Sequence, residues 1–251
     1  MKAFLLTAGL GTRLGPLTDK TAKCLLPING KPLLQIWLEL LSRYDVDQVL
    51  VNTHWHHEKV EQYISTDYAD GINNEKIKNK PIVKLYYEPD LLGSAGTLLA
   101  NRDWVADGEP FFVLYGDNLT DVNLLKMHEF HKQHELPFTL GVFRSDEPER
   151  CGIADIDESG LVVDFVEKPE TPKSNLAHAG INIADKRIFD FFPPNAEAIR
   201  PLDLGFHVIP NLVGEMKAYF IEEFLMDIGT PESYEKAQKI YPQITQIKIC
   251  L

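Results

Sequence analysis

A glycine-rich segment near the start of the chain has the residue types that bind phosphate. Gly9-Leu10-Gly11-Thr12-Arg13 directly follows an apolar run, residues 3–8. A glycine turn after a strand exposes backbone N–H groups that can hold phosphate oxygens. Residues 1–31 contain five basic side chains and one acidic side chain, although the whole chain has a net charge of −12. A small polyanion is therefore the predicted ligand of this segment.

The glycine segment differs from two common nucleotide-binding motifs. A dinucleotide-binding loop needs G-x-G-x-x-G, but Leu14 stands at the third glycine position and Gly15 comes one residue late. A Walker loop needs G-x-x-x-x-G-K-[ST], but Gly30-Lys31 is followed by Pro32 and Leu25 replaces the first glycine. The sequence thus excludes a Walker-type ATPase and removes the main support for a dehydrogenase.

Short apolar runs alternate with helix-length amphipathic segments in the first half of the chain. This alternation predicts a mainly parallel sheet covered by helices. After residue 150 the runs follow one another too closely for crossover helices, which indicates added antiparallel strands. Helices are expected to begin at Pro32 and within residues 93–97, and another is expected over residues 233–241. The predicted strands are residues 3–8, 49–52, 82–87, 111–115, 138–143, 152–156, 161–166 and 179–184.

Composition restricts the class of protein. The chain has 251 residues, 44% of them hydrophobic, and no Pro/Gly/Ser linker, which suits one large α/β domain. Its acidity disfavours nucleic acid and membrane surfaces as partners, and no apolar run approaches the roughly 20 residues that span a bilayer. Cys24, Cys151 and Cys250 form no C-x-x-C pair and are expected to be reduced thiols. These features predict a soluble, cytoplasmic protein.

An ordered series of motifs over residues 3–240 resembles the sugar-phosphate nucleotidylyltransferase family. The resemblance implies a single-domain, Rossmann-like, three-layer α/β/α nucleotidyltransferase fold with a mixed central sheet over residues 1–251, without the C-terminal β-helix domain of some members. It also implies the reaction: a nucleoside monophosphate passes from a nucleoside triphosphate to a sugar 1-phosphate, and pyrophosphate is released. The motifs are residues 6–18, residues 23–32, Gly93-Ser94-Ala95-Gly96-Thr97, Tyr115-Gly116-Asp117, Glu167-Lys168-Pro169, Ala179-Gly180-Ile181 and Asp227-Ile228-Gly229-Thr230-Pro231.

The resemblance assigns the phosphates of the nucleotide to the first two motifs. Arg13 would hold the triphosphate and Lys23 would bridge the reacting phosphates, as catalytic residues. Two polyanionic substrates can meet only if positive charge is brought to the reacting centre. The implied nucleotide-binding residues are Leu6, Ala8, Gly9, Gly11, Thr12, Glu88, Gly93, Ser94, Ala95 and Gly96.

A pair of aspartates is implied to bind Mg²⁺. Asp117 follows the apolar run 111–115, and Asp227 follows residues 224–226. A hard cation is commonly held by one or two carboxylates and by phosphate oxygens. Either aspartate alone would more often be a turn or cap residue, so the pair carries the prediction. Asp203 and Asp164 belong to no motif and are expected to be structural.

The sugar 1-phosphate is implied to bind at the motif that contains Glu167 and Lys168. A carboxylate suits sugar hydroxyls and an ammonium suits phosphate. The phosphate monoester is itself the nucleophile, and its second pKa of about 6 leaves it largely dianionic at neutral pH, so no general base is required. The other implied residues of this subsite are Asn118, Gly152 and Gly180.

Three histidines raise the alternative of a zinc site. His54, His56 and His57 follow the predicted strand 49–52 but lack H-E-x-x-H spacing. A surface at the start of a helix is the favoured interpretation.

The resemblance is strongest to mannose-1-phosphate guanylyltransferase-like members, and Glu88 could accept hydrogen bonds from guanine. Gly15, Ala22, His178 and Asn182 depart from the pattern and leave the sugar open. One alternative is the same reaction with another sugar 1-phosphate, of a heptose, glucose or an amino sugar, and UTP, CTP or dTTP. The other is a non-catalytic sugar-nucleotide-binding regulatory subunit. A glycosyltransferase would need a D-x-D motif, which Asp117-Asn118-Leu119 does not supply. Oligomeric state, including a homo-oligomer, stays open.

Overall fold

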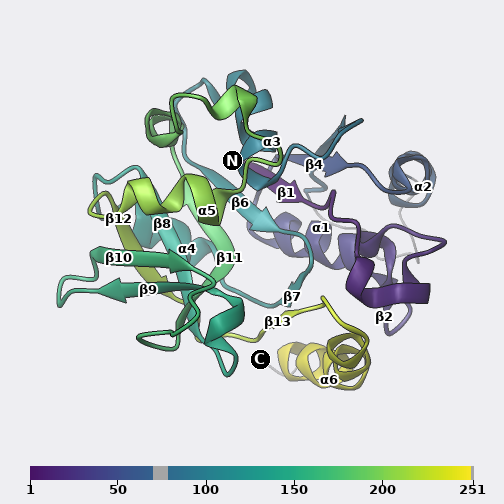
Figure 1. The fold of residues 1–251 in the computed structure, drawn as a ribbon. Helices are drawn as coiled ribbons and strands as arrows, with labels where there is room; N and C mark the ends of the chain where they lie inside the picture. The colour runs from purple at the N-terminus through teal and green to yellow at the C-terminus, as the bar shows by residue number, and fades with distance from the viewer. Residues whose placement is uncertain (70–78, 250–251) are drawn as a thin grey trace. The chain divides into compact units, whose positions relative to one another are not determined.

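The computed structural model describes residues 1–69 and 79–249. Figure 1 shows its helices and strands. The internal contacts of the chain divide it into two compact units. Unit 1 comprises Met1–Phe4, Leu91–Leu114 and Asn123–Glu222, and unit 2 comprises Leu5–Asp90, Tyr115–Val122 and Glu223–Leu251. Strand β1 (Lys2–Leu6) begins in unit 1 and ends in unit 2. The expected single domain, residues 1–251, stays a prediction.

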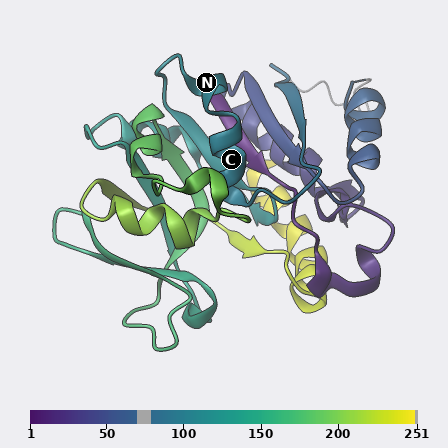
Figure 2. The same cartoon turned by 45° about the horizontal axis from the view of Figure 1, so that its top comes forward.

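Unit 2 contains a parallel pair of strands and helices with one apolar face. Strand β4 pairs with β5 in parallel, from Gln48 opposite Ile82 to Thr53 opposite Tyr87. Helix α1 buries seven leucine, isoleucine and tryptophan side chains, and β13 leads directly into α6 (Figure 2). The elements are β2 (Pro27–Ile28), β3 (Lys31–Pro32), α1 (Leu33–Arg43), β4 (Gln48–Thr53), α2 (His57–Tyr63), β5 (Ile82–Tyr87), β7 (Asn118–Thr120), β13 (Leu225–Asp227) and α6 (Pro231–Ile249).

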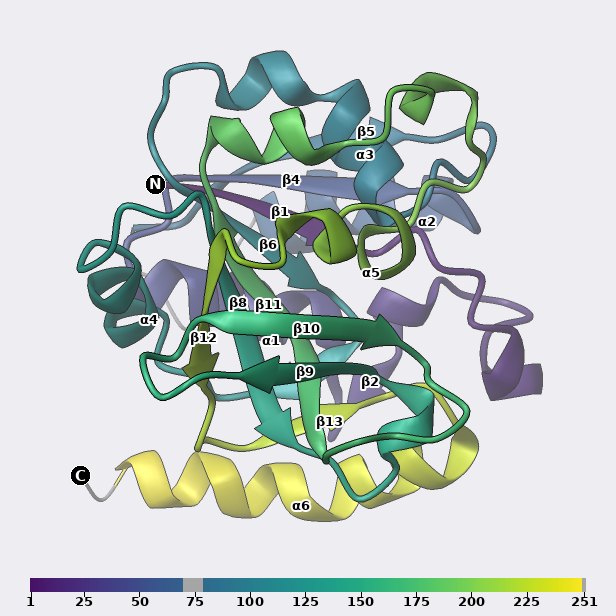
Figure 3. The same cartoon turned by 60° about the vertical axis from the view of Figure 1, so that its left-hand side comes forward.

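Unit 1 is organised around strand β11, which pairs antiparallel with β6, β8 and β9. Strands β9 and β10 form an antiparallel hairpin, and α5 lies next to β10 (Figure 3). Strand β12 pairs with β8 in parallel. The elements are α3 (Ser94–Ala100), β6 (Phe111–Tyr115), α4 (Leu124–His131), β8 (Phe138–Arg144), β9 (Gly152–Ile156), β10 (Val162–Glu167), β11 (Leu176–Ala184), α5 (Leu204–His207) and β12 (Met216–Phe220). Parallel and antiparallel pairs thus occur together, and the prediction of an α/β fold with a mixed sheet is confirmed.

Short segments of 3₁₀ helix connect several of these elements. Two of them, η1 (Thr12–Leu17) and η2 (Lys23–Leu25), belong to the phosphate-binding motifs of unit 2. The others are η5 (Arg102–Val105), η6 (Pro148–Arg150), η7 (Lys186–Phe191), η8 (Ala196–Ala198) and η9 (Ile209–Leu212), and a π-helical segment, η3 (Ile64–Tyr68), continues α2.

All eight predicted strands are present, and five of them have shifted ends. Strand β1 stops at Leu6 because the N–H of Thr7 turns to the side chain of Asn52, at 2.6 Å. Helix α1 begins one residue after Pro32, because Pro32 pairs with Pro27 in the β2–β3 ladder. The short ladder of β7 with β13, and the parallel strand β12, were not predicted.

Two further predictions concern the cysteines and membrane spans. Cys24 and Cys151 form no disulfide with any described residue, and Cys250 lies outside the described residues. Helix α6 is the longest of the described helices, and neither it nor any other described helix has the apolar stretch that a membrane span requires.

Candidate functional site

The glycine segment of unit 2 lines a pocket of about 190 Å³. Gly9, Gly11, Thr12 and Arg13 form one side of it, after β1 has ended at Leu6. Nucleotide-sized ligands usually occupy pockets of roughly 300–1,000 Å³. The pocket therefore has room for the phosphate part of a nucleotide. Its other lining residues in unit 2 are Leu6, Thr7, Lys23, Cys24, Gly116, Asp117 and Gly229.

The two predicted metal-binding aspartates lie together at one end of the β7–β13 ladder. Asp227 is the last residue of β13 and is paired with Asn118, the first residue of β7. The N–H of Ile228 donates to the carbonyl oxygen of Asp117 at 2.9 Å, which continues the pairing beyond the strands. Backbone hydrogen bonds therefore bring together two carboxylates that are 110 positions apart in the sequence.

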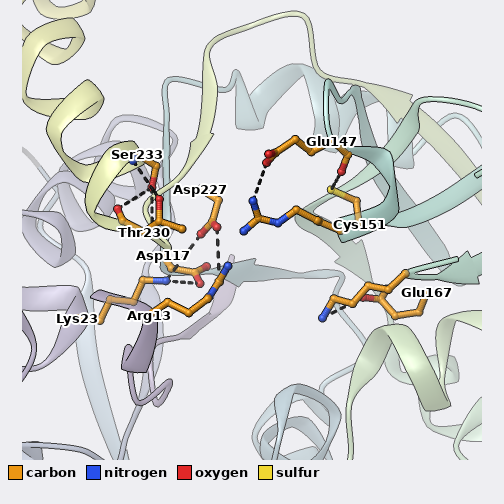
Figure 4. Close-up of polar contacts among 11 residues, drawn as sticks. Arg13, Lys23, Asp117, Glu147, Cys151, Glu167, Asp227, Thr230 and Ser233 are labelled. Atoms are coloured by element: carbon orange, nitrogen blue, oxygen red, sulfur yellow. Dashed lines mark hydrogen bonds and ion pairs between the residues drawn. The ribbon is translucent and has the colours of Figure 1, made fainter. Parts of the chain in front are cut away.

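Lys23 lies between the two carboxylates (Figure 4). Its Nζ donates to Oδ2 of Asp117 at 2.8 Å and lies 3.7 Å from Oδ1 of Asp227. Nη2 of Arg13 lies 3.8 Å from Oδ2 of Asp227. The Lys23 side chain is only 9% exposed, whereas those of Asp117 and Asp227 are 38% and 51% exposed. The lysine stem is thus fixed by packing while the carboxylates face solvent.

Gly229 permits this close approach of charged groups. A Cβ at this position would lie 2.3 Å from Oδ2 of Asp227 and 2.7 Å from Nη2 of Arg13. Any side chain here would push the aspartate and the arginine apart. The motif Asp227-Ile228-Gly229 contains this signal, but the sequence prediction used only its aspartate.

The donor set of this cluster suits a hard divalent cation. The carboxylates of Asp117 and Asp227 both lie within 4 Å of the Lys23 ammonium, and both are partly open to solvent. Mg²⁺ is typically bound by one or two carboxylates, with phosphate oxygens and water completing its shell. In residues 1–69 and 79–249 no group of three or more His, Cys, Asp or Glu residues could hold a metal by itself. The residues therefore fit a cation that also needs ligands from a bound phosphate.

Cys24 also lines this pocket. Its side chain is buried, and burial raises the pKa of its thiol to about 12. The thiol is therefore protonated at neutral pH.

Glu88 is buried at the end of a polar chain in unit 2. Only 1% of the residue is exposed, and its Oε1 accepts a hydrogen bond from Nδ2 of Asn52 at 2.8 Å. Asn52 in turn accepts from the backbone N–H and the hydroxyl of Thr7, at 2.6 and 2.5 Å. Sequence reasoning missed Asn52 and Thr7, which connect Glu88 to the pocket wall. The role of Glu88 at a guanine base stays a prediction.

The predicted nucleotide-binding residues Gly93 to Gly96 open helix α3 in unit 1, as expected. The N–H groups of Ala95 and Gly96 both donate to the carbonyl oxygen of Leu202, at 3.0 Å. The Ser94 hydroxyl donates to Oδ2 of Asp203 at 3.0 Å. These donors thus have partners within unit 1, and their contact with a nucleotide stays a prediction.

Three of the predicted sugar-binding residues of unit 1, Gly152, Glu167 and Lys168, lie together at the end of β10. Glu167 is the last residue of this strand, paired with Gly152, and so does not follow the strand as the sequence suggested. Its side chain is 13% exposed, and its Oε1 lies 3.8 Å from Nζ of Lys168. Burial, and then the charge of Asp203, raise the pKa of Glu167 above its ordinary value. Gly180 lies elsewhere, in an irregular stretch of β11 with a φ of 66°, and Asn118 belongs to unit 2.

The three histidines after β4 lie where helix α2 begins. His56 is its N-cap residue and His57 its first residue, whereas Nδ1 of His54 is 2.7 Å from the carbonyl oxygen of Glu88. The interpretation as a surface at a helix start agrees with these positions.

Comparison with known proteins identifies the family. The chain is 30% identical over 246 residues to a mannose-1-phosphate guanylyltransferase catalytic subunit beta of Dictyostelium discoideum, and 33% identical to mannose-1-phosphate guanylyltransferase 1 of Arabidopsis thaliana. Both alignments cover 96% of this chain but 64% of the relative, so the chain spans less than two thirds of their length.

A solved structure, an apo UDP-glucose pyrophosphorylase, has a similar fold. Its TM-score is 0.79 at 22% identity, and the match covers 96% of this chain and 98% of the other. The family model described as nucleotidyl transferase matches residues 2–244. The chain therefore belongs to the nucleotidyl transferase family, as the motifs indicated.

Proposed function

We propose that the protein transfers a nucleoside monophosphate from a nucleoside triphosphate to a sugar 1-phosphate and releases pyrophosphate. The observation that carries the proposal is the cluster in unit 2, where Lys23 and Arg13 lie within 4 Å of Asp117 or Asp227 at the edge of the phosphate-sized pocket. Family membership and the mannose-1-phosphate guanylyltransferase relatives support the same reaction.

In this proposal the residues of unit 2 hold the triphosphate. The backbone N–H groups of Gly9 to Thr12 would donate hydrogen bonds to phosphate oxygens, as in other glycine turns after a strand. Arg13 and Lys23 place positive charge beside the α-phosphate, where negative charge increases as the sugar phosphate oxygen attacks. Positioning and charge suffice, because the attacking phosphate is already ionised.

The proposed cofactor is Mg²⁺, bound by Asp117 and Asp227 and by phosphate oxygens of the substrates. The family generally depends on a divalent metal. When bound, the cation would neutralise phosphate charge and help to orient the two substrates.

In unit 1, Glu167 and Lys168 would bind the sugar 1-phosphate. The carboxylate of Glu167 can accept hydrogen bonds from sugar hydroxyls, and the ammonium of Lys168 can donate to the phosphate. GTP and mannose 1-phosphate are the favoured pair, on the strength of the relatives at 30% and 33% identity. The protein would act in nucleotide-sugar biosynthesis in the cytoplasm, without nucleic acid or membrane as a partner.

A substrate screen tests this proposal. GTP, UTP, CTP, dTTP and ATP are each combined with common sugar 1-phosphates and Mg²⁺, and pyrophosphate is measured. The proposal predicts release from at least one pair, with GTP and mannose 1-phosphate the first expectation. Folded protein that releases no pyrophosphate from any pair would instead favour the regulatory, sugar-nucleotide-binding alternative.

A further inference from the structure

Helix α5 contacts both predicted sugar-phosphate residues of unit 1. It packs against β10, which ends at Glu167. Gly205 lies against the carboxylate, since a Cβ there would be 2.4 Å from Oε2 of Glu167. The next residue, Phe206, faces the next residue of the motif: Nζ of Lys168 lies 5.6 Å from the centroid of the Phe206 ring. Consecutive residues of α5, Gly205 and Phe206, therefore lie beside the consecutive residues Glu167 and Lys168.

The backbone of this turn is held by a set of hydrogen bonds. The N–H of Phe206 donates to Oδ1 of Asp203 at 3.1 Å, and the Ser94 hydroxyl donates to Oδ2 of the same carboxylate at 3.0 Å. The N–H of Leu204 donates to Oγ of Ser94 at 2.7 Å. Asp203, expected to be structural, does fix this helix, and with it the position of the Phe206 ring.

The Lys168 side chain is more than half exposed to solvent. The residue has a φ of 48°, and its N–H donates to the carbonyl oxygen of Cys151 at 3.0 Å. Left-handed backbone is uncommon outside glycine. The side chain is 56% exposed, and its Nζ lies 3.8 Å from Oε1 of Glu167. With Glu167 engaged by sugar hydroxyls, the Phe206 ring would still attract the ammonium, which lies 5.6 Å from its centroid.

Phe206 is more exposed than a residue of the core. It is 53% exposed although it is large and apolar. A cation within about 6 Å of an aromatic ring is attracted by the electron density of its face. We propose that Phe206 is a positioning residue for the sugar 1-phosphate, whose ring holds the Lys168 ammonium where it meets the phosphate. This inference rests on the proposed function.

The first test compares Phe206→Leu with Phe206→Trp. Leucine keeps the apolar bulk but removes the ring. Tryptophan keeps an aromatic ring, and an indole ring attracts cations more strongly than a phenyl ring does. Phe206→Leu should raise the KM for sugar 1-phosphate about two- to fivefold, the effect of one exposed cation–π contact. The kcat and the KM for the nucleoside triphosphate should stay unchanged in Phe206→Leu. Phe206→Trp should keep the wild-type KM for sugar 1-phosphate. Phe220→Leu is the matched control, since Phe220 is 44% exposed on β12 of the same unit.

A second comparison asks whether Phe206 acts through Lys168. In a Lys168→Ala background, Phe206→Leu should have no further effect on the KM, because the ammonium it positions is gone. A further rise of the KM in the double variant would overturn the inference and indicate direct contact between the ring and the sugar.

An NMR readout is independent of turnover. Ring currents of Phe206 should shift the Lys168 Hε resonances upfield, and the shift should disappear in Phe206→Leu. An unshifted Lys168 resonance, or a wild-type KM in Phe206→Leu, overturns the inference while wild-type turnover still supports the proposed function. Absence of wild-type turnover with any substrate pair would overturn the function itself.

Discussion

Replacing Lys23 with methionine should almost abolish turnover and leave the fold nearly as stable as before. Methionine fills the buried space of the lysine stem but removes the ammonium that lies 2.8 Å from Asp117 and 3.7 Å from Asp227. Both carboxylates are more than one third exposed, so solvent screens these pairs, and each contributes at most about 1 kcal/mol to the free energy of unfolding. Loss of a charge that stabilises the transition state costs more, about 3 kcal/mol or a hundredfold in kcat/KM.

The same variant should change the affinity of the free protein for a divalent cation. Without the ammonium, the carboxylates of Asp117 and Asp227 lack their nearest counter-charge, so Mn²⁺ should bind more tightly in the absence of nucleotide. The assay measures kcat/KM, melting temperature and Mn²⁺ binding for Lys23→Met beside Lys20→Met, an exposed lysine of the same segment. Wild-type turnover by Lys23→Met would refute the reasoning, as would a loss of turnover that follows only from unfolding.

Three further predictions concern the aspartates, the sugar subsite and a buried histidine. Asp117→Asn and Asp227→Asn should each keep a near-normal melting temperature and lose turnover, and the double variant should lose much less than the product of the two, as measured by kcat at limiting Mg²⁺. The KM for sugar 1-phosphate should rise as pH falls through the raised pKa of Glu167, because protonation removes a hydrogen-bond acceptor. Asp203→Asn removes a negative charge that helps to raise this pKa, so the rise in KM should move to lower pH. A pH profile of kcat/KM measures both effects. Burial lowers the pKa of His131 to about 4 in the folded protein, from about 6.5 in the unfolded chain. Between these two pH values only the unfolded state binds a proton at this imidazole. The free energy of unfolding should therefore fall by at most about 3 kcal/mol as the pH is lowered from 6.5 to 4. Urea denaturation at several pH values checks this slope, which should be shallower in His131→Asn.

The sequence predicted the elements of the fold better than the pairing that makes the site. Residues 82–87 and 111–115 are strongly apolar or β-branched runs, and strands β5 and β6 begin and end at these positions. Strands β7 and β13 have three residues each, too few for an alternating pattern to appear. Their pairing joins segments about 100 positions apart and could not be read from local periodicity. The convergence of the two aspartates was therefore expected from motifs alone, and the ladder supplies its physical cause.

The surroundings of individual side chains, like the strand pairing, could not be predicted from the sequence. Glu88 has the residue type of a base-recognition group, but burial depends on what packs around it, and the fold covers it almost completely. Asp203 belongs to no motif, yet its carboxylate fixes helix α5 and adds to the rise that burial causes in the pKa of Glu167. Phe206 likewise has no family signature, and only the packing of α5 against β10 brings its ring to Lys168.

The fate of isotopic label in the nucleotide tests the central claim most directly. The proposed attack on the α-phosphorus breaks the bond between the α- and β-phosphates, so the α-phosphate must pass to the sugar and the γ-phosphate must leave in pyrophosphate. With the active triphosphate from the screen, α-labelled substrate should give labelled nucleotide-sugar and unlabelled pyrophosphate, and γ-labelled substrate should give the reverse. Label from the γ-position on the sugar, or α-label recovered only as free nucleotide, would contradict nucleotidyl transfer by this site.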